Sequence, residues 1–311
     1  MIINKNLYLN LNIIKFYTMD IIKINKYISR IKKDGFIILP NLLKKEECAK
    51  LVEKIKKLHK EIKNNSNHFL NNGQGTIRDI DNSHRASKNG QETLRDLVLR
   101  DPKTYLNLID IPEIIKILEN IFHDNFILDN LMASNTCKVD NNYSAKKHID
   151  SHLAVKKFPL TLDVVVMICC NDIDKNNGST IVWKGSQNSG IRIQNNQYKF
   201  KENKYKKIYL KANAGSAIIC LGHTWHQIGK NVNGKDRWVI LCHYKRWWIK
   251  PATDFTKCGK RIFRLLNNKQ KELFGFNSIS PKFNLKKKTR RYYTLSKIEK
   301  IPKNYIDINN Y

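Results

Sequence analysis

The chain has 311 residues, 41% of them hydrophobic, which is enough for a folded core and excludes a wholly disordered protein. Its 57 Lys and Arg outnumber 27 Asp and Glu, and the formal net charge of +30 would attract nucleic acid or other polyanions. The sequence is also crowded with Asn and Ile, the mark of a source rich in A and T codons. The charge by itself is therefore interpreted as a solvated basic surface.

The cysteines predict buried free thiols in a reducing compartment. There are seven, an odd number, and no Cys-x-x-Cys pair occurs, so neither a disulfide framework nor a zinc site is expected. No unbroken apolar stretch reaches the length of a membrane span, and no signal peptide with a clean apolar centre is found. We expect a soluble, intracellular (cytoplasmic) protein.

The first part of the chain predicts helices around one short strand. Apolar residues at three-and-four spacing place an amphipathic helix over residues 44–63, with lysines on the opposite face. Residues 20–34 and 111–122 predict two further helices. An apolar run at residues 35–40 predicts a strand ended by proline, and residues 64–90 read as a long polar loop.

Short strand-like runs separated by polar turns dominate from residue 126 onward. They cover residues 126–131, 162–170, 179–183, 216–221 and 238–244. Helices followed by many short strands predict an α+β fold, a β-sandwich or jelly roll with helices packed outside. We divide the chain into an N-terminal extension (1–18), one domain (19–285) and a basic C-terminal tail (286–311).

Two sequence patterns predict a metal site. His148 and Asp150 lie two residues apart, so on an extended backbone both project to one face. Alone, such a pair is most often a surface ion pair or a turn. His226, after the strand at 216–221, supplies a third ligand from a distant segment. Two histidines and one carboxylate leave three coordination positions open for a bidentate cosubstrate and O2, and favour Fe(II) or Mn(II), although zinc would also bind.

Other histidines compete for these roles. His223 lies three residues before His226 and is an alternative ligand. His148 and His152 form His-x-x-x-His, but the glutamate of a zinc-protease helix is absent. We interpret His243 as a core residue or as a group that supports the ligands.

Arg237 is the third feature with chemical meaning. It alternates with Val239 and Leu241, so if these two side chains point inward, Arg237 does too. A buried guanidinium is costly unless it is paired, and a dicarboxylate cosubstrate is a natural bidentate partner. The alternative partner is a protein carboxylate such as Asp163. The eleven-residue spacing from His226 to Arg237 favours His226 over His223 as the ligand.

Taken together, these motifs resemble the phytanoyl-CoA dioxygenase family of 2-oxoglutarate oxygenases. The resemblance covers about residues 30–280 in the order and spacing of the family. The matching segments are residues 35–40, His148-Ile149-Asp150, the Asn-Gly turn at residues 177–186, and Trp225-His226 followed by Asn231 and Arg237.

The resemblance implies a double-stranded β-helix (jelly roll, cupin-like) with Fe(II) at His148, Asp150 and His226. It also implies that Arg237 clamps the far carboxylate of 2-oxoglutarate and that Asn135 makes a polar contact to this cosubstrate. The implied activity is a dioxygenase that uses O2, hydroxylates its substrate and converts 2-oxoglutarate to succinate. Asp150, in place of Ala or Gly, indicates a hydroxylase and not a halogenase.

Four positions depart from the family pattern. Ile228 stands where members often have a Ser that helps to hold the cosubstrate carboxylate. Lys147 replaces a common aromatic residue, and Lys184 and Gln187 replace the Pro and His of Pro-Gly-Ser-His. These departures concern cosubstrate binding and leave the metal set intact.

Two other functions fit the residues. One is a cupin-like isomerase or hydrolase that uses Zn or Mn without redox chemistry. The other is a basic nucleic-acid-binding protein on a decayed oxygenase scaffold, for which the basic cluster at residues 286–291 speaks. For the enzyme we expect a small-molecule substrate. The polar, basic loops at residues 64–90 and 187–206 are the expected lids and favour an anionic substrate.

Overall fold

The computed structural model describes residues 21–64, 80–81, 91–139, 145–151, 153, 161–193, 204–279 and 282–291. The expected N-terminal extension, most of the expected lid at residues 64–90, half of the one at residues 187–206, and His152 lie outside these residues.

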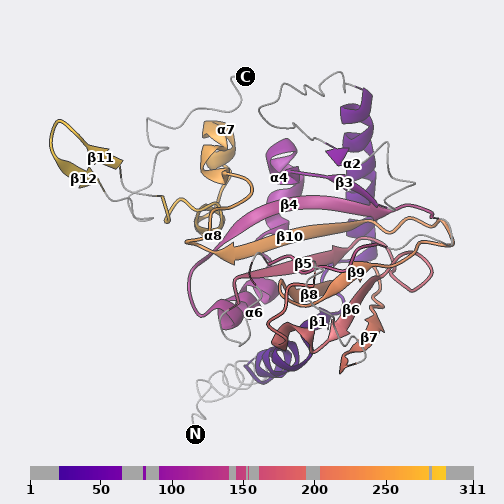
Figure 1. Cartoon of the computed structure of the whole chain (residues 1–311). Coiled ribbons are helices and arrows are strands. Elements are labelled where there is room, and N and C mark those ends of the chain that lie inside the picture. The colour runs from indigo at the N-terminus through magenta and orange to yellow at the C-terminus, as the bar shows by residue number, and fades with distance from the viewer. Residues whose placement is uncertain are drawn as a thin grey trace, which may run out of the picture.

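Two antiparallel sheets form the centre of the protein. The larger one has seven strands in the order β1-β8-β5-β10-β4-β3-β2, and the smaller one has the order β7-β6-β9. In Figure 1, β4, β10 and β5 run side by side across the molecule, and the smaller sheet lies at the lower right. This is the double-stranded β-helix that the family resemblance implied, so the expected fold is confirmed.

The strand bounds follow. The larger sheet contains β1 (Phe36–Leu39), β2 (Ile80–Asp81), β3 (Gln91–Leu94), β4 (Phe126–Thr136), β5 (Asp163–Cys169), β8 (Ala217–Leu221) and β10 (Val239–Arg246). The smaller sheet contains β6 (Thr180–Lys184), β7 (Lys206–Tyr209) and β9 (His226–Ile228).

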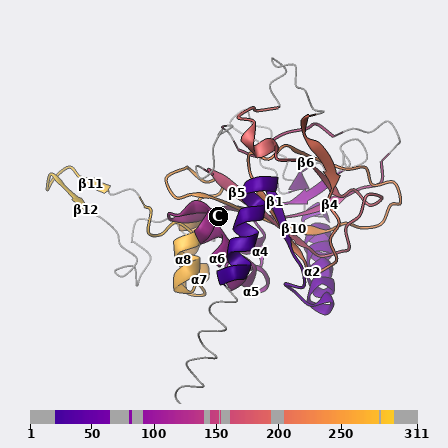
Figure 2. The same ribbon diagram turned by 90° about the horizontal axis from the view of Figure 1, so that it is seen from below.

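Helices cover the outer face of the larger sheet, several of them seen from below in Figure 2. Residues 21–34 are helical. The other helices are α2 (Lys45–Asn64), α4 (Leu97–Arg100), α5 (Pro102–Tyr105), α6 (Pro112–Phe122), α7 (Gly259–Phe263) and α8 (Asn268–Leu273). Helix α6 begins with Pro112, whose missing N–H costs nothing in the first turn, and its apolar stripe buries Ile114, Leu118 and Ile121.

The alternation of β10 separates the two interiors of the molecule. Cys242 and Tyr244 point to the helices, and the Tyr244 hydroxyl donates to the carbonyl of Ile109 at 2.8 Å. Val239 and Leu241 belong to a second apolar cluster between the two sheets. Arg237, two residues before Val239, continues the inward face, as its spacing predicted.

The expected helices and strands are found with shifted ends, but β3, β7 and β9 were missed. Strand β7 is mostly exposed and rich in lysine, and β9 has only three residues, so neither has a readable alternation of apolar and polar side chains. A hairpin, β11 (Lys282–Asn284) and β12 (Thr289–Arg291), follows the core, and the expected domain boundary at residue 285 falls in its turn.

The cysteines and the helices bear on two of the expectations from the composition. All seven cysteines are free thiols, five of them buried, as expected. No helix in the described part of the chain combines the length and hydropathy needed to cross a membrane.

Candidate active site

The two histidines predicted to bind metal are joined through their backbones. The N–H of His148 donates to the carbonyl of His226, and the N–H of His226 donates to the carbonyl of His148, both at 2.9 Å. The segment that carries His148 therefore extends the smaller sheet beyond its edge strand β9. Next to His226, the buried Trp225 donates from its indole to the carbonyl of Ile191 at 3.0 Å, which holds the start of β9.

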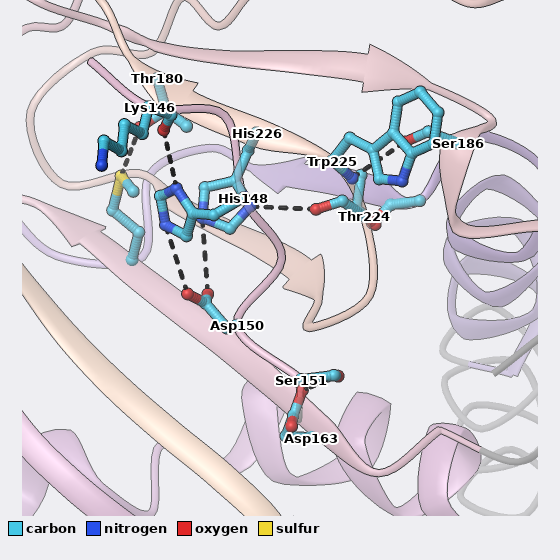
Figure 3. Close-up of polar contacts among 12 residues, drawn as sticks. Lys146, His148, Asp150, Ser151, Asp163, Thr180, Ser186, Thr224, Trp225 and His226 are labelled. Carbon is cyan, nitrogen blue, oxygen red and sulfur yellow. Dashed lines mark hydrogen bonds and ion pairs between the residues drawn. The ribbon is translucent and has the colours of Figure 1, made fainter. Parts of the chain in front are cut away.

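Asp150 completes a cluster with these two histidines. Its Oδ1 lies 3.6 Å from Nε2 of His148, and its Oδ2 lies 3.6 Å from Nε2 of His226. One ligand atom from each of the three residues lies within 4.8 Å of the others, and no other such cluster occurs among the described residues. Figure 3 shows the three side chains pointing toward one common space.

Backbone carbonyls determine the tautomer of both imidazoles. Nδ1 of His148 lies 3.1 Å from the carbonyl of Lys146, and Nδ1 of His226 lies 3.0 Å from the carbonyl of Thr224. A carbonyl only accepts, so each Nδ1 carries the proton and each Nε2 offers a lone pair. Both lone pairs are on the atoms that face Asp150, as in metal-binding histidines held by a second hydrogen bond.

The electrostatics of the cluster favour the protonation states that a metal ion needs. Burial lowers the pKa of His148, and the charge of His226 lowers it further. Burial alone would raise the pKa of Asp150, but the imidazoles of His226, His243 and His148 outweigh it and lower that pKa. The two lowered pKa values favour a neutral His148 imidazole and an ionised Asp150 carboxylate, so neither group has to lose a proton before it coordinates a cation.

The backbone around Asp150 is held by a close approach at Gly222. The N–H groups of Asp150 and Ser151 both donate to the carbonyl of Gly222, at 2.8 and 3.0 Å. The Ser151 hydroxyl in turn donates to Oδ1 of Asp163 at 2.6 Å (Figure 3). A Cβ on Gly222 would lie 1.4 Å from that same Oδ1, so only glycine fits here.

Arg237 is buried between the two sheets, with 2% of its surface exposed. Its Nη2 donates to Oγ1 of Thr180 at 2.7 Å and lies 3.6 Å from the Met167 sulfur, and its buried Nε has no hydrogen-bond partner. None of the carboxylates in the described residues forms an ion pair with it. Burial lowers the pKa of Arg237 to about 10, because no anionic partner among the described residues stabilises its charge.

Two buried asparagines hold the segment that leads to Arg237. Oδ1 of Asn135, on β4, accepts from the backbone N–H of Arg237 at 2.9 Å. Nδ2 of Asn231 donates to the carbonyls of Thr136 and Lys235, both at 2.8 Å, and its Oδ1 accepts from the N–H of Gly234 at 2.8 Å. Asn135 thus holds the backbone of Arg237. The contact of Asn135 to the cosubstrate that the resemblance implied stays a prediction.

The structure separates the alternatives that the sequence left open. His223 is buried in the turn between β8 and β9 and does not join the cluster of His148 and Asp150, so His226 is the histidine that converges with them. Asp163 bonds to Ser151 and not to Arg237. His243 lies on the inner face of β10, and its charge acts on Asp150, so it is a neighbour of the cluster.

Sequence reasoning missed Thr180 as a site residue. Thr180 pairs with Ile228 across β6 and β9, so the hydroxyl beside Arg237 comes from the strand opposite the position where family members often have Ser. The available signal was the alternation of β6, in which Thr180 and Val182 share the inner face.

The fold and this cluster define a metal-binding double-stranded β-helix protein. The sequence profile described as phytanoyl-CoA dioxygenase (PhyH) matches residues 31–239, more than half of the chain. The chain therefore belongs to the phytanoyl-CoA dioxygenase family, and the expected family is confirmed. No curated protein matches it in sequence.

Solved structures of similar fold are enzymes described as dependent on, or crystallised with, 2-oxoglutarate (α-ketoglutarate). The α-ketoglutarate-dependent epimerase SnoN from nogalamycin biosynthesis has a TM-score of 0.54 and 16% identity, over 72% of this chain and 81% of SnoN. HygX from Streptomyces hygroscopicus, with nickel and 2-oxoglutarate bound, has a TM-score of 0.52 and 11% identity, over 73% of this chain and 88% of HygX. The α-ketoglutarate-dependent carbocyclase SnoK from nogalamycin biosynthesis has a TM-score of 0.51 and 12% identity, over 71% of this chain and 83% of SnoK. At these identities the likeness concerns the fold.

Proposed function

We propose that this protein is an Fe(II)- and 2-oxoglutarate-dependent dioxygenase that hydroxylates a small molecule. The observation that carries the proposal is the convergence of His148, Asp150 and His226 beside the buried and unpaired guanidinium of Arg237. A non-redox metalloenzyme needs the metal cluster but does not need a buried guanidinium for a dicarboxylate cosubstrate.

The donor set suits Fe(II). Two imidazole nitrogens and one carboxylate, with no cysteine among the three residues of the cluster, form the ligand set of non-haem Fe(II) oxygenases with open positions. Bound Fe(II) would supply O2 activation, with 2-oxoglutarate as the co-reductant that leaves as succinate and CO2. His148 and His226 would hold the ion through Nε2, because their Nδ1 atoms are occupied by backbone carbonyls.

The residues around Arg237 suit the far carboxylate of 2-oxoglutarate. A guanidinium binds a carboxylate in a bidentate fork, and the free Nε of Arg237 is one of the donors available for it. Thr180 keeps Nη2 in place and offers a hydroxyl next to the same carboxylate. Asn135 and Asn231 fix the backbone, so that the guanidinium does not have to be ordered when the cosubstrate binds.

Succinate formation tests the proposal. Purified full-length protein with Fe(II), 2-oxoglutarate and O2 should release succinate and CO2, slowly without substrate and faster with it. Omission of Fe(II) or O2, or the variant Asp150→Ala, should stop the release. Zn- or Mn-dependent turnover with no consumption of 2-oxoglutarate would contradict the proposal and favour a non-redox isomerase or hydrolase.

We propose that the substrate is hydroxylated, and the oxygen content of the product tests this. One oxygen atom of O2 would enter succinate and the other would enter the product, so the product should gain one oxygen atom. An epimerase such as SnoN or a carbocyclase such as SnoK, by their descriptions, carries out a different conversion. A product with unchanged oxygen content would therefore overturn hydroxylation and leave the 2-oxoglutarate chemistry standing.

A further inference from the structure

A cavity of about 330 Å³ lies on the outer face of the smaller sheet. Tyr209, Ile181 and Gln227 are direct neighbours across β7, β6 and β9, and all three line it. On β6, Thr180 contacts Arg237 inside the barrel, so Ile181 points to the opposite side. The cavity is thus separate from the space in which the cosubstrate would bind.

Three lysines line this cavity, and none of the described residues that line it carries a carboxylate. The lysines are Lys175, Lys207 and Lys230. The ammonium groups of Lys175 and Lys207 lie 5.3 and 5.4 Å from the centre of the same Tyr209 ring. Each ammonium group is thus held by a cation–π contact, and two positive charges stand at the cavity, where they would attract an anion.

Gln227 provides an independent sign of a ligand. It lines the cavity, only 9% of its surface is exposed, and its buried Oε1 has no hydrogen-bond partner. An unpaired buried amide oxygen is unfavourable in a native protein. A ligand hydroxyl would satisfy it, or a half-turn of the amide would present its NH2 group to an anionic oxygen.

We propose that this cavity binds a small organic anion that carries a phosphate or carboxylate group. Lys175 and Lys207 would pair with the charged group, and Tyr209 and Ile181 would contact the apolar part. The volume falls within the range of small-molecule sites, roughly 300–1,000 Å³. Gln227 directly follows His226 on β9, so the ligand would contact the back of the strand that carries this metal-site histidine.

The proposal is tested by isothermal titration calorimetry, which measures the binding of phenyl phosphate to the full-length protein. Phenyl phosphate combines a phosphate with a flat apolar ring, and benzoate and inorganic phosphate serve as comparison ligands. We expect saturable binding of one phenyl phosphate per chain that persists with Fe(II) and 2-oxoglutarate present in excess. Stronger binding of benzoate than of phenyl phosphate would assign the site to carboxylates instead.

Lysine variants separate a built site from general attraction to a basic surface. Lys207→Met should weaken binding at least tenfold, and Gln227→Leu should weaken it without a change of charge. Lys206→Met is the matched control, because Lys206 is the exposed neighbour on β7 and does not line the cavity. No saturable binding, equal losses in Lys206→Met and Lys207→Met, or displacement by 2-oxoglutarate would each overturn the proposal.

Discussion

The backbone N–H of Arg237 donates a hydrogen bond of 2.9 Å to Oδ1 of Asn135, which lies 102 positions earlier in the chain. The guanidinium at the end of this residue is buried and lacks an anionic partner among the described residues, so its position depends on how its backbone is held. The placement of the Arg237 guanidinium, the proposed clamp for 2-oxoglutarate, thus depends on both β4 and the segment before β10.

Asn135→Ala should therefore weaken the binding of 2-oxoglutarate, because Asn135 holds the backbone of Arg237. The change leaves the buried N–H of Arg237 unpaired, at a cost of about 1–3 kcal/mol. The affinity should be measured by anaerobic titration of the Fe(II)-loaded protein, with the charge-transfer absorbance of the bound 2-oxo acid as the signal. Asn130→Ala, another buried asparagine of β4, is the control and should leave the affinity unchanged.

Arg237→Ala should raise the dissociation constant of 2-oxoglutarate by roughly 100-fold to several thousandfold, corresponding to about 3–5 kcal/mol for a buried charge pair that loses one partner. Arg237→Lys should give an intermediate loss, because lysine keeps the charge without the bidentate fork. The same titration with 2-oxobutyrate, which lacks the far carboxylate, isolates the interaction. Its affinity should be equal in wild type and Arg237→Ala, and a parallel loss would indicate a general disruption of the site.

His226→Ala should abolish binding of Fe(II), whereas His223→Asn should retain it. His226 presents Nε2 to Asp150, while His223 is buried away from the cluster and burial lowers its pKa to about 4. Metal content after reconstitution with Fe(II) under anaerobic conditions is the measurement. Iron retained in His226→Ala and lost in His223→Asn would reverse the assignment of the ligand.

The sequence was sufficient for residues whose role depends on spacing along one strand. His148 and Asp150 share a face because they are two apart, and Arg237 follows the inward alternation of Val239 and Leu241. Thr180 could not be recognised in this way, because its role comes from a contact with Arg237 across 57 positions of the chain. Such partners depend on which strands face each other, and that is decided by the packing of the two sheets.

Asn135 and β7 illustrate the same limit. The family resemblance singled out Asn135, but its hydrogen bond to the backbone of Arg237 joins β4 to the segment before β10 and could not be predicted from the sequence. Strand β7 is held by pairing with β6 rather than by buried side chains of its own, so its lysine-rich sequence resembled a loop. Both depend on hydrogen bonds between segments that local patterning does not encode.

Gly222→Ala should destabilise the fold and displace Asp150. The new methyl group would lie 1.4 Å from Oδ1 of Asp163, so the backbone that accepts from Asp150 and Ser151 must move. We expect a loss of several degrees in Tm together with a loss of bound iron. Removal of the clashing carboxylate in Gly222→Ala/Asp163→Ala should recover part of both, because the two residues are coupled through one contact. Simple addition of the two single-variant effects would contradict this contact.

Asp163→Asn should stabilise the protein at neutral pH and have little effect near pH 4. Burial raises the pKa of Asp163 to about 6, and the charge of Asp150 adds to the rise against the hydrogen bond from Ser151 and the charge of Lys245. The folded state thus binds a proton more tightly than the unfolded chain does, so the wild type loses stability as the pH rises through this interval. The raised pKa of Asp163 lowers the free energy of unfolding at neutral pH by about 2–3 kcal/mol.

In the variant, asparagine keeps an acceptor for the Ser151 hydroxyl without a titratable group. Urea unfolding of both proteins at several pH values between 4 and 7 measures the difference, which should grow with pH and level off above the raised pKa. A difference that stays constant over this range would mean that Asp163 does not titrate there.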